Sequence, residues 1–108
     1  MFSLKNKTAL VTGGSRGIGR AITIALAEAG ARVAFVYRED EAAAKDLIKE
    51  VEEKGCNVLA FKADVSCETA VSNVIKSVIG EFKGLDILIN NAGILRHGLL
   101  TDMSIEEF

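Results

Sequence analysis

The sequence predicts an α/β fold in which helices cover both faces of a parallel sheet. Two observations lead to this prediction. Short apolar segments typical of buried strands alternate with longer segments that have apolar residues at helical spacing, and glycines end the helical segments. Strands that alternate with helices form right-handed crossover units, so successive strands run parallel. In a doubly wound sheet, four such strands take the order 3-2-1-4, and ligands bind at their carboxyl ends, where the order reverses.

The expected strands are 7–12, 32–37, 57–64 and 85–90. The expected helices are 18–29, 41–54 and a third that Ser66 caps and Gly84 ends. Gly30 lies where the end of the first helix favours a left-handed residue. In that helix, the apolar positions that recur at helical spacing and should face the core are Ile18, Ala21, Ile22, Ala25, Leu26 and Ala29.

Length and composition favour a single domain over residues 1–108, without linkers, repeats or low-complexity segments. The net charge of −2 gives no general attraction to nucleic acid or to an anionic membrane surface. No apolar run is long enough to span a membrane, and the N-terminal segment lacks the features of an export signal. Cys56 and Cys67 have neither metal-site spacing nor a neighbouring histidine cluster. We therefore expect a cytoplasmic protein with reduced thiols, no metal site, and no nucleic-acid or membrane partner.

A glycine-rich segment, TGGSRGIG at 12–19, follows the first expected strand and opens the first helix. Such a corner directs free backbone N–H groups and the positive end of the helix at one point, which suits a phosphate or diphosphate. Glycines at 13, 17 and 19 let the backbone approach the anion and let the helix approach the strand. A turn that only changes chain direction is the alternative, but the position after the first strand favours an anion site. The segment lacks the Gly-Lys-Ser/Thr of phosphotransferase loops.

The spacing Thr-Gly-x-x-x-Gly-x-Gly differs from the common G-x-G-x-x-G motif, because Ile22 stands where the third glycine would fall. It resembles the motif of the short-chain dehydrogenase/reductase family. NNAG at 90–93, after the fourth strand, and Asp64-Val65, after the third, match further signatures of that family. Within the family, the segments TGGSRGIGRAI, NNAGI and LLTDMSIEEF are most similar to 3-oxoacyl-[acyl-carrier-protein] reductases. The resemblance implies a Rossmann-type domain, of which this chain would be the N-terminal, dinucleotide-binding half.

The resemblance also implies roles for residues at the ends of the later strands. Asp64 would accept a hydrogen bond from the adenine amino group, and the backbone of Val65 would lie beside the ring. Asn91, Ala92 and Gly93 would line the ribose. Two alternatives stay open: Asp64 as a turn residue before Ser66, and the asparagines as local backbone partners at the strand end. The loop residues expected at the cofactor are Gly13, Ser15, Arg16, Gly17, Ile18 and Gly19, while Thr12 could hydrogen-bond the loop instead.

The end of the second strand bears on which dinucleotide is bound. A carboxylate there accepts a hydrogen bond from an adenosine 2′-hydroxyl and repels a 2′-phosphate, whereas arginine favours the phosphate. This chain has Tyr37 followed by Arg38, and Arg16 lies within reach in the glycine loop. Glu39 and Asp40 come next and are expected to face solvent at the start of a helix. These residues predict NADP(H), unless Arg38 is only a solvated loop arginine.

Members of the family that this chain resembles reduce carbonyls with a serine, a tyrosine and a lysine spaced Tyr-x-x-x-Lys, and an asparagine on a later helix. In this chain the single tyrosine is Tyr37, and Glu41 stands four residues later. We therefore assign no catalytic residue and expect the 108-residue chain to be inactive alone. His97 could approach the substrate side, although a solvated loop histidine is the simpler explanation.

The C-terminal segment predicts that the chain is truncated. The capping-box sequence SIEE at 104–107 begins a helix, but only Phe108 follows it, which is too short for a stable helix. The strand at 85–90 has the composition of a strand buried on both faces and flanked on both sides. Without a further strand beside it, its outer edge would be open to association. We expect residues 1–108 alone to be marginally stable or to self-associate.

Three interpretations of function follow. The first is the cofactor-binding part of an NADPH-dependent oxidoreductase that reduces a carbonyl to an alcohol. The resemblance suggests 3-oxoacyl groups on acyl carrier protein as substrate, and a homo-oligomer when the protein is complete. The second is a non-catalytic NADP(H)-binding module; a downstream serine and Tyr-x-x-x-Lys would favour the reductase over it. The third is a redox-silent α/β domain that pairs with a partner and binds no NADPH.

Overall fold

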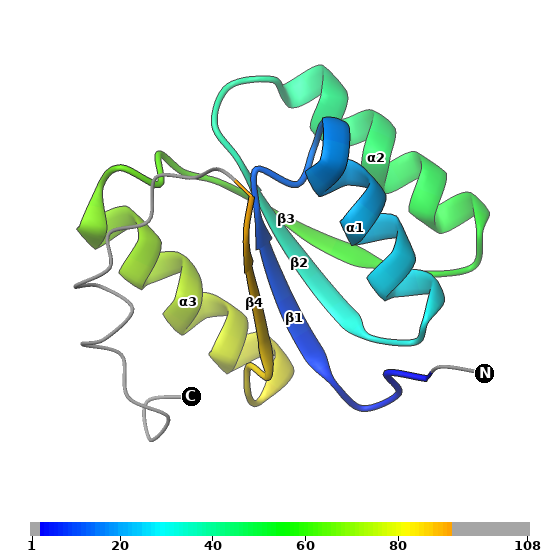
Figure 1. The fold of residues 1–108 in the computed structure, drawn as a ribbon. Coiled ribbons are helices and arrows are strands. Elements are labelled where there is room, and N and C mark those ends of the chain that lie inside the picture. Colours follow the sequence, from blue (N-terminus) through cyan, green and yellow to red (C-terminus); the bar gives the residue numbers. More distant parts are fainter. Residues whose placement is uncertain (1–2, 92–108) are drawn as a thin grey trace.

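The computed structural model describes residues 3–91, which form a sheet with helices on both faces (Figure 1). The elements, in chain order, are β1 (Thr8–Thr12), α1 (Gly17–Glu28), β2 (Arg32–Tyr37), α2 (Glu41–Glu53), β3 (Val58–Lys62), α3 (Glu68–Phe82) and β4 (Ile87–Asn90). The alternation of strands and helices is therefore confirmed. The strands expected at 57–64 and 85–90 are shorter in the structure than the sequence predicts. No helix within residues 3–91 is long and apolar enough to cross a membrane.

The sheet is parallel throughout, and its strand order, β3-β2-β1-β4, is the predicted one. The pairing register brings the carboxyl ends of the strands to one edge: Thr12 of β1 pairs with both Val36 of β2 and Asn90 of β4. On the other side of β2, Tyr37 pairs with Lys62 of β3. The loops that follow the four strands therefore start at the same edge of the sheet, at the top of Figure 1.

Alternate residues of the two central strands point into two separate cores. Val11, Val33 and Phe35 are buried on the face covered by α1 and α2. Leu10 and Val36 are buried on the opposite face, against the apolar side of α3. This explains why the central strands are apolar throughout instead of alternating with polar residues. The two cores hold the carboxyl edge of the sheet rigidly, and the loops project from it.

The predicted core face of α1 is right in part: Ile22 and Leu26 pack against the core, whereas Ala21 and Ala25 are exposed. The buried residues of α1 are Gly19, Thr23 and Ala27, whereas Ile18 is 71% exposed. Small residues are required because the helix lies very close to the sheet: a Cβ atom on Gly14 would come within 2.9 Å of Thr23 Oγ1. The Thr23 hydroxyl donates to Gly19 O at 2.8 Å, so its burial leaves no unpaired donor. Counting apolar side chains missed the buried positions Gly19 and Thr23, because glycine and threonine do not count as apolar.

The ends of α3 also differ from the prediction. Cys67, not Ser66, occupies the N-cap position, and it caps the helix with no side-chain hydrogen bond. The N–H and hydroxyl of Ser66 both donate to Asp64 Oδ1, so Ser66 belongs to the preceding turn. At the other end, Lys83 adopts the left-handed conformation (φ 65°), one residue before the expected Gly84. Gly30, by contrast, has φ 101° after α1, as its position predicts.

Candidate functional site

The glycine loop joins β1 to α1 and leaves the start of this helix open. Gly13 and Gly17 have φ of 67° and 57°, in the left-handed region that favours glycine. Arg16 occupies the N-cap position and makes no side-chain capping hydrogen bond, and the first turn of α1 contains no acidic residue. The positive end of α1 is therefore not neutralised by the chain's own side chains, which suits an external anion.

Gly19 allows the first turn of α1, the glycine loop and Asn91 to lie in close contact. A Cβ atom on Gly19 would overlap the carbonyl oxygen of Gly13 and would lie 2.7 Å from Asn91 Nδ2. The Asn91 amide in turn donates to Gly13 O at 3.2 Å. Asn91, directly after β4, is therefore tied to the glycine loop, in agreement with the predicted strand order. The Thr12 hydroxyl donates to Asn90 Oδ1 at 3.1 Å, so it links β1 to the end of β4.

A cavity of about 720 Å³ opens at this edge of the sheet, a volume typical of small-molecule sites. Its lining comes from the glycine loop, the segment after β2 and the end of β4: Gly13, Ser15, Arg16, Tyr37, Arg38, Glu39, Asp40 and Asn91. Six of these eight residues are among the predicted cofactor residues. Segments far apart in the sequence thus converge on one cavity, as expected at the reversal of strand order.

Five other predicted residues do not line this cavity, namely Gly17, Ile18, Gly19, Asp64 and Val65, and the rest lie outside the described part of the chain. Gly17, Ile18 and Gly19 form the first turn of α1, which starts at the cavity-lining Arg16. Val65 packs its side chain against the core beneath α3. Ala92, Gly93, His97 and the segment 104–107 lie outside the described residues.

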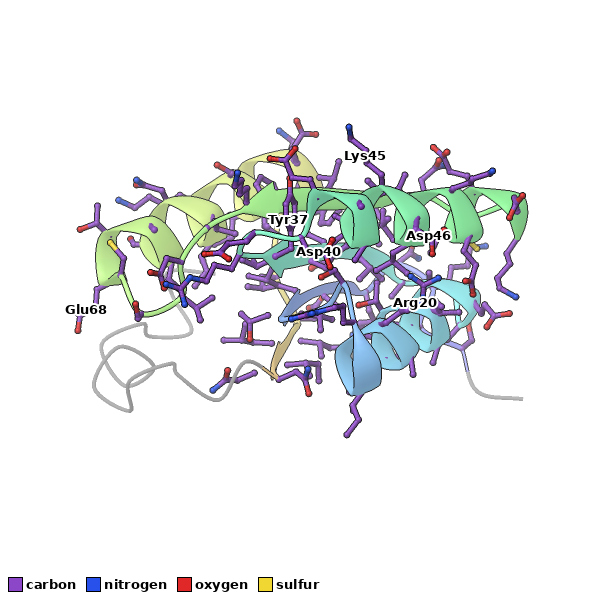
Figure 2. The ribbon with its side chains drawn as sticks, turned by 90° about the horizontal axis from the view of Figure 1, so that it is seen from above. Arg20, Tyr37, Asp40, Lys45, Asp46 and Glu68 are labelled. Carbon is purple, nitrogen blue, oxygen red and sulfur yellow. The ribbon has the colours of Figure 1, made fainter. Side chains whose placement is uncertain are left out.

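Sequence reasoning missed two residues of the cavity, Glu39 and Asp40. Both are exposed, as expected, and Asp40 caps α2 by accepting a hydrogen bond from Ala43 N at 2.9 Å. Both also line the cavity. Seen from above, Tyr37 and Asp40 lie close together where the chain passes from β2 to α2 (Figure 2). Glu39 and Asp40 directly follow Arg38 at the carboxyl end of a strand, and this position is the signal that could have placed them at the cavity.

The charges near Arg38 are mixed. Its guanidinium lies 3.5 Å (Nη2) from Asp64 Oδ2 and 3.9 Å (Nε) from Glu39 Oε1, and the side chain is 66% exposed. The pKa of Asp64 is lowered, first by the hydrogen bond from the Ser66 hydroxyl, next by that from the Ser66 N–H, and less by Arg38. Asp64 is therefore an anion at neutral pH.

Three further ion pairs join the elements beside the cavity. Lys62 Nζ donates to Glu41 Oε1 at 2.9 Å, and this pair lowers the pKa of Glu41 and raises that of Lys62. Arg20 of α1 points toward α2, where its Nη2 lies 3.1 Å from Asp46 Oδ2 (Figure 2). Arg20 also contacts Glu50, so two acids hold its charge away from the cavity. No group of acids, cysteines and histidines within residues 3–91 is arranged to hold a metal ion.

Comparison with known proteins gives consistent matches. A family model described as short chain dehydrogenase matches residues 7–108. The 3-oxoacyl-[acyl-carrier-protein] reductase FabG of Staphylococcus aureus (strain N315) is 44% identical over 102 residues, which is 94% of this chain and 42% of that protein. General stress protein 39 of Bacillus subtilis is 43% identical over 90 residues, covering 83% of this chain and 32% of that protein. The chain spans about two fifths of the length of its FabG relatives.

Solved structures agree with these matches. A short chain dehydrogenase from Burkholderia cenocepacia J2315, in complex with NADP, superposes with a TM-score of 0.79 at 45% identity, covering 96% of this chain and 42% of that one. A short-chain dehydrogenase/reductase from Serratia marcescens BCRC 10948 gives 0.79 at 43% identity, covering 82% and 36%.

Proposed function

This chain belongs to the short-chain dehydrogenase family, and on that premise we propose that it forms the NADP(H)-binding part of an NADPH-dependent carbonyl reductase. One observation supports the choice of cofactor: Arg16 and Arg38, from two different loops, line the same cavity. Tyr37, at the end of β2, leaves no carboxylate at the strand tip itself. Among residues 3–91 no acid forms an ion pair with Arg16, so its charge is available to a phosphate.

In the proposed complex the diphosphate lies at the start of α1, against Gly13, Ser15, Gly17, Ile18 and Gly19. Arg16 and Arg38 hold the 2′-phosphate of the adenosine. At the neighbouring strand tips, Asp64 and the backbone of Val65 receive the adenine, while Asn91, Ala92 and Gly93 line the ribose. These assignments follow the family resemblance, and those of Gly13, Ser15, Arg16, Arg38 and Asn91 are also supported by the single cavity that these residues line.

The bound cofactor supplies a hydride to a substrate carbonyl, and the developing alkoxide takes up a proton. The described residues bind and orient the cofactor, and we assign none of them as the proton donor. For the protein as a whole we propose reduction of 3-oxoacyl groups on acyl carrier protein, because of the similarity to FabG proteins. We also propose one domain over residues 1–108, no activity from these residues alone, a homo-oligomer for the whole protein, and a cytoplasmic location, with which the two free cysteines agree.

The direct test is to titrate the intact protein with NADPH and with NADH. We expect tighter binding of NADPH, and we expect Arg38→Ala to weaken NADPH binding about tenfold or more while changing NADH binding little, because a charge-assisted phosphate contact is lost. Arg32→Ala is the matched control, since Arg32 is an exposed arginine at the opposite end of β2. Equal or tighter binding of NADH, or an unchanged NADPH affinity in Arg38→Ala, would refute the NADPH assignment.

Turnover separates the reductase from the alternative, a non-catalytic NADP(H)-binding module. The intact protein is mixed with NADPH and a 3-oxoacyl thioester, and NADPH absorbance is followed with time. Loss of absorbance with formation of the 3-hydroxyacyl product supports the reductase. Tight NADPH binding without any turnover of carbonyl substrates supports the module.

A further inference from the structure

The tips of β2 and β3 bring Arg38, a cation that lines the cavity, next to the anion Asp64. Tyr37 pairs with Lys62 at the end of the strands, and Ala63 N donates to Tyr37 O at 3.0 Å one residue further on. The next side chains, Arg38 and Asp64, are then close enough for their Nη2 and Oδ2 atoms to lie 3.5 Å apart. The register of β2 and β3 thus brings together Arg38 and Asp64, which lie far apart in the sequence.

Asp64 is held in place by the turn that follows it. Its Oδ1 accepts two hydrogen bonds from Ser66, from the N–H at 2.9 Å and from the hydroxyl at 2.7 Å. Its carbonyl oxygen accepts a third hydrogen bond, from Cys67 N at 2.9 Å. With Oδ1 engaged, Oδ2 is the oxygen that faces Arg38. Asp64 is charged at neutral pH, as an ordinary aspartate would be, and its lowered pKa extends the charged range to lower pH.

Glu39 is a second carboxylate near the Arg38 guanidinium, but unlike Asp64 it is not held in place. Its carboxylate lies 3.9 Å from Arg38 Nε, its side chain is 83% exposed, and no hydrogen bond within residues 3–91 anchors it. An exposed arginine loses much rotamer freedom when it binds a ligand, and an anchored carboxylate reduces that loss. Because a guanidinium has five N–H donors, a contact to Asp64 through Nη2 leaves others for a phosphate.

Resting on the proposed function, we propose that Ser66 and Asp64 form a brace that positions Arg38 toward the 2′-phosphate of NADP(H). Asp64 is thus a positioning residue for cofactor selectivity, in addition to the adenine contact that the resemblance implies. The selectivity of the site then depends on the turn after β3 as well as on the tip of β2. An adenine contact affects NADPH and NADH equally, whereas the brace affects NADPH alone.

The test compares dissociation constants for NADPH and NADH in the intact protein and its variants. We expect Asp64→Asn to reduce the preference for NADPH roughly two- to fivefold, and Ser66→Ala to reduce it in the same direction by less. Glu39→Gln removes a carboxylate from the same guanidinium and is expected not to reduce the preference. Ser77→Ala, whose hydroxyl donates within α3 to Asn73 O, controls for loss of a hydroxyl elsewhere. In an Arg38→Ala background, Asp64→Asn should no longer change the preference.

Other results would overturn the inference. If Asp64→Asn weakens both cofactors equally, Asp64 serves only the adenine. If Asp64→Asn and Glu39→Gln both strengthen NADPH binding, the carboxylates compete with the phosphate instead of positioning Arg38. An NADPH-preferring parent whose preference does not change in Asp64→Asn refutes the brace and leaves the proposed function intact. A parent without NADPH preference refutes both.

Discussion

Gly19 shows how a single residue decides whether the site can form. It is one of three buried residues of α1, and the space where its side chain would begin is filled by the Gly13 carbonyl and the Asn91 amide. The carbonyl belongs to the backbone of the glycine loop, so it cannot move aside without reshaping the loop. The close contact of helix and loop, on which the proposed anion site depends, therefore requires the absence of a Cβ atom at this position.

Gly19→Ala is expected to weaken NADPH binding at least tenfold and to destabilise the fold by about 1–3 kcal/mol, because the new methyl group overpacks the corner. Gly80→Ala is the matched control: Gly80 is also helical, but a Cβ atom there would meet nothing within 4 Å. That variant should be neutral or stabilising by up to about 1 kcal/mol. NADPH titration and thermal unfolding measure both effects. A Gly19→Ala variant that binds NADPH as tightly as the parent would contradict this account.

At the scale of elements, sequence reasoning worked where one pattern dominates. Within residues 3–91, apolar strands and helical spacing predicted the order of the elements and the sheet topology, and the glycine loop indicated the edge at which the cavity opens. Reasoning failed where close packing or local hydrogen bonds decide. The fully buried positions of α1 are small residues, and Ser66 binds Asp64 instead of capping α3. Likewise, the contact of Arg38 with Asp64 depends on strand register, which local patterns do not specify.

Asp86 links the amino ends of β1 and β4 by hydrogen bonds. These are the two adjacent strands whose carboxyl ends lead into the glycine loop and Asn91. Its Oδ2 accepts a hydrogen bond from Thr8 N at 2.9 Å, and its own N–H donates to Thr8 O at 3.0 Å. The hydrogen bond from Thr8 N is the first cause of the lowered pKa of Asp86, and the nearby Lys7 and Arg32 lower it further. A carboxyl whose folded pKa is depressed stabilises the fold above its unfolded pKa, and this contribution is lost as pH falls through the folded pKa.

We therefore expect Asp86→Asn to lower the melting temperature near neutral pH, with the difference from the parent shrinking below about pH 4. The measurement is a series of thermal melts between about pH 3 and pH 7. This range spans the ordinary aspartate pKa of about 4. Glu52→Gln, an exposed carboxylate on α2, is the control and should show little difference at any pH. A difference between Asp86→Asn and the parent that stays constant down to pH 3 would show that the hydrogen bonds do not depend on the charge.

At the scale of the whole molecule, the sheet is unevenly covered. All five residues of β1 are buried, whereas those of β4 are half-buried or exposed. β4 pairs with β1 along one edge, and within residues 3–91 no strand pairs with its other edge. An apolar strand with an open edge can pair with the same strand of another molecule. The relatives, of which this chain spans about two fifths, have further chain available to cover such an edge.

A polypeptide of residues 1–108 alone is thus expected to unfold at a low temperature or to associate through β4. Light scattering after gel filtration, and melting curves over a hundredfold range of concentration, measure this directly. Ile87→Lys places a charge on the strand, outside both core clusters, and should increase the monomer fraction because a charged edge resists pairing. A monomer with a sharp melting transition that does not depend on concentration would show that the edge needs no cover. Association that persists unchanged in Ile87→Lys would instead place the contact elsewhere, with the edge of β3, also half-buried, as the next candidate.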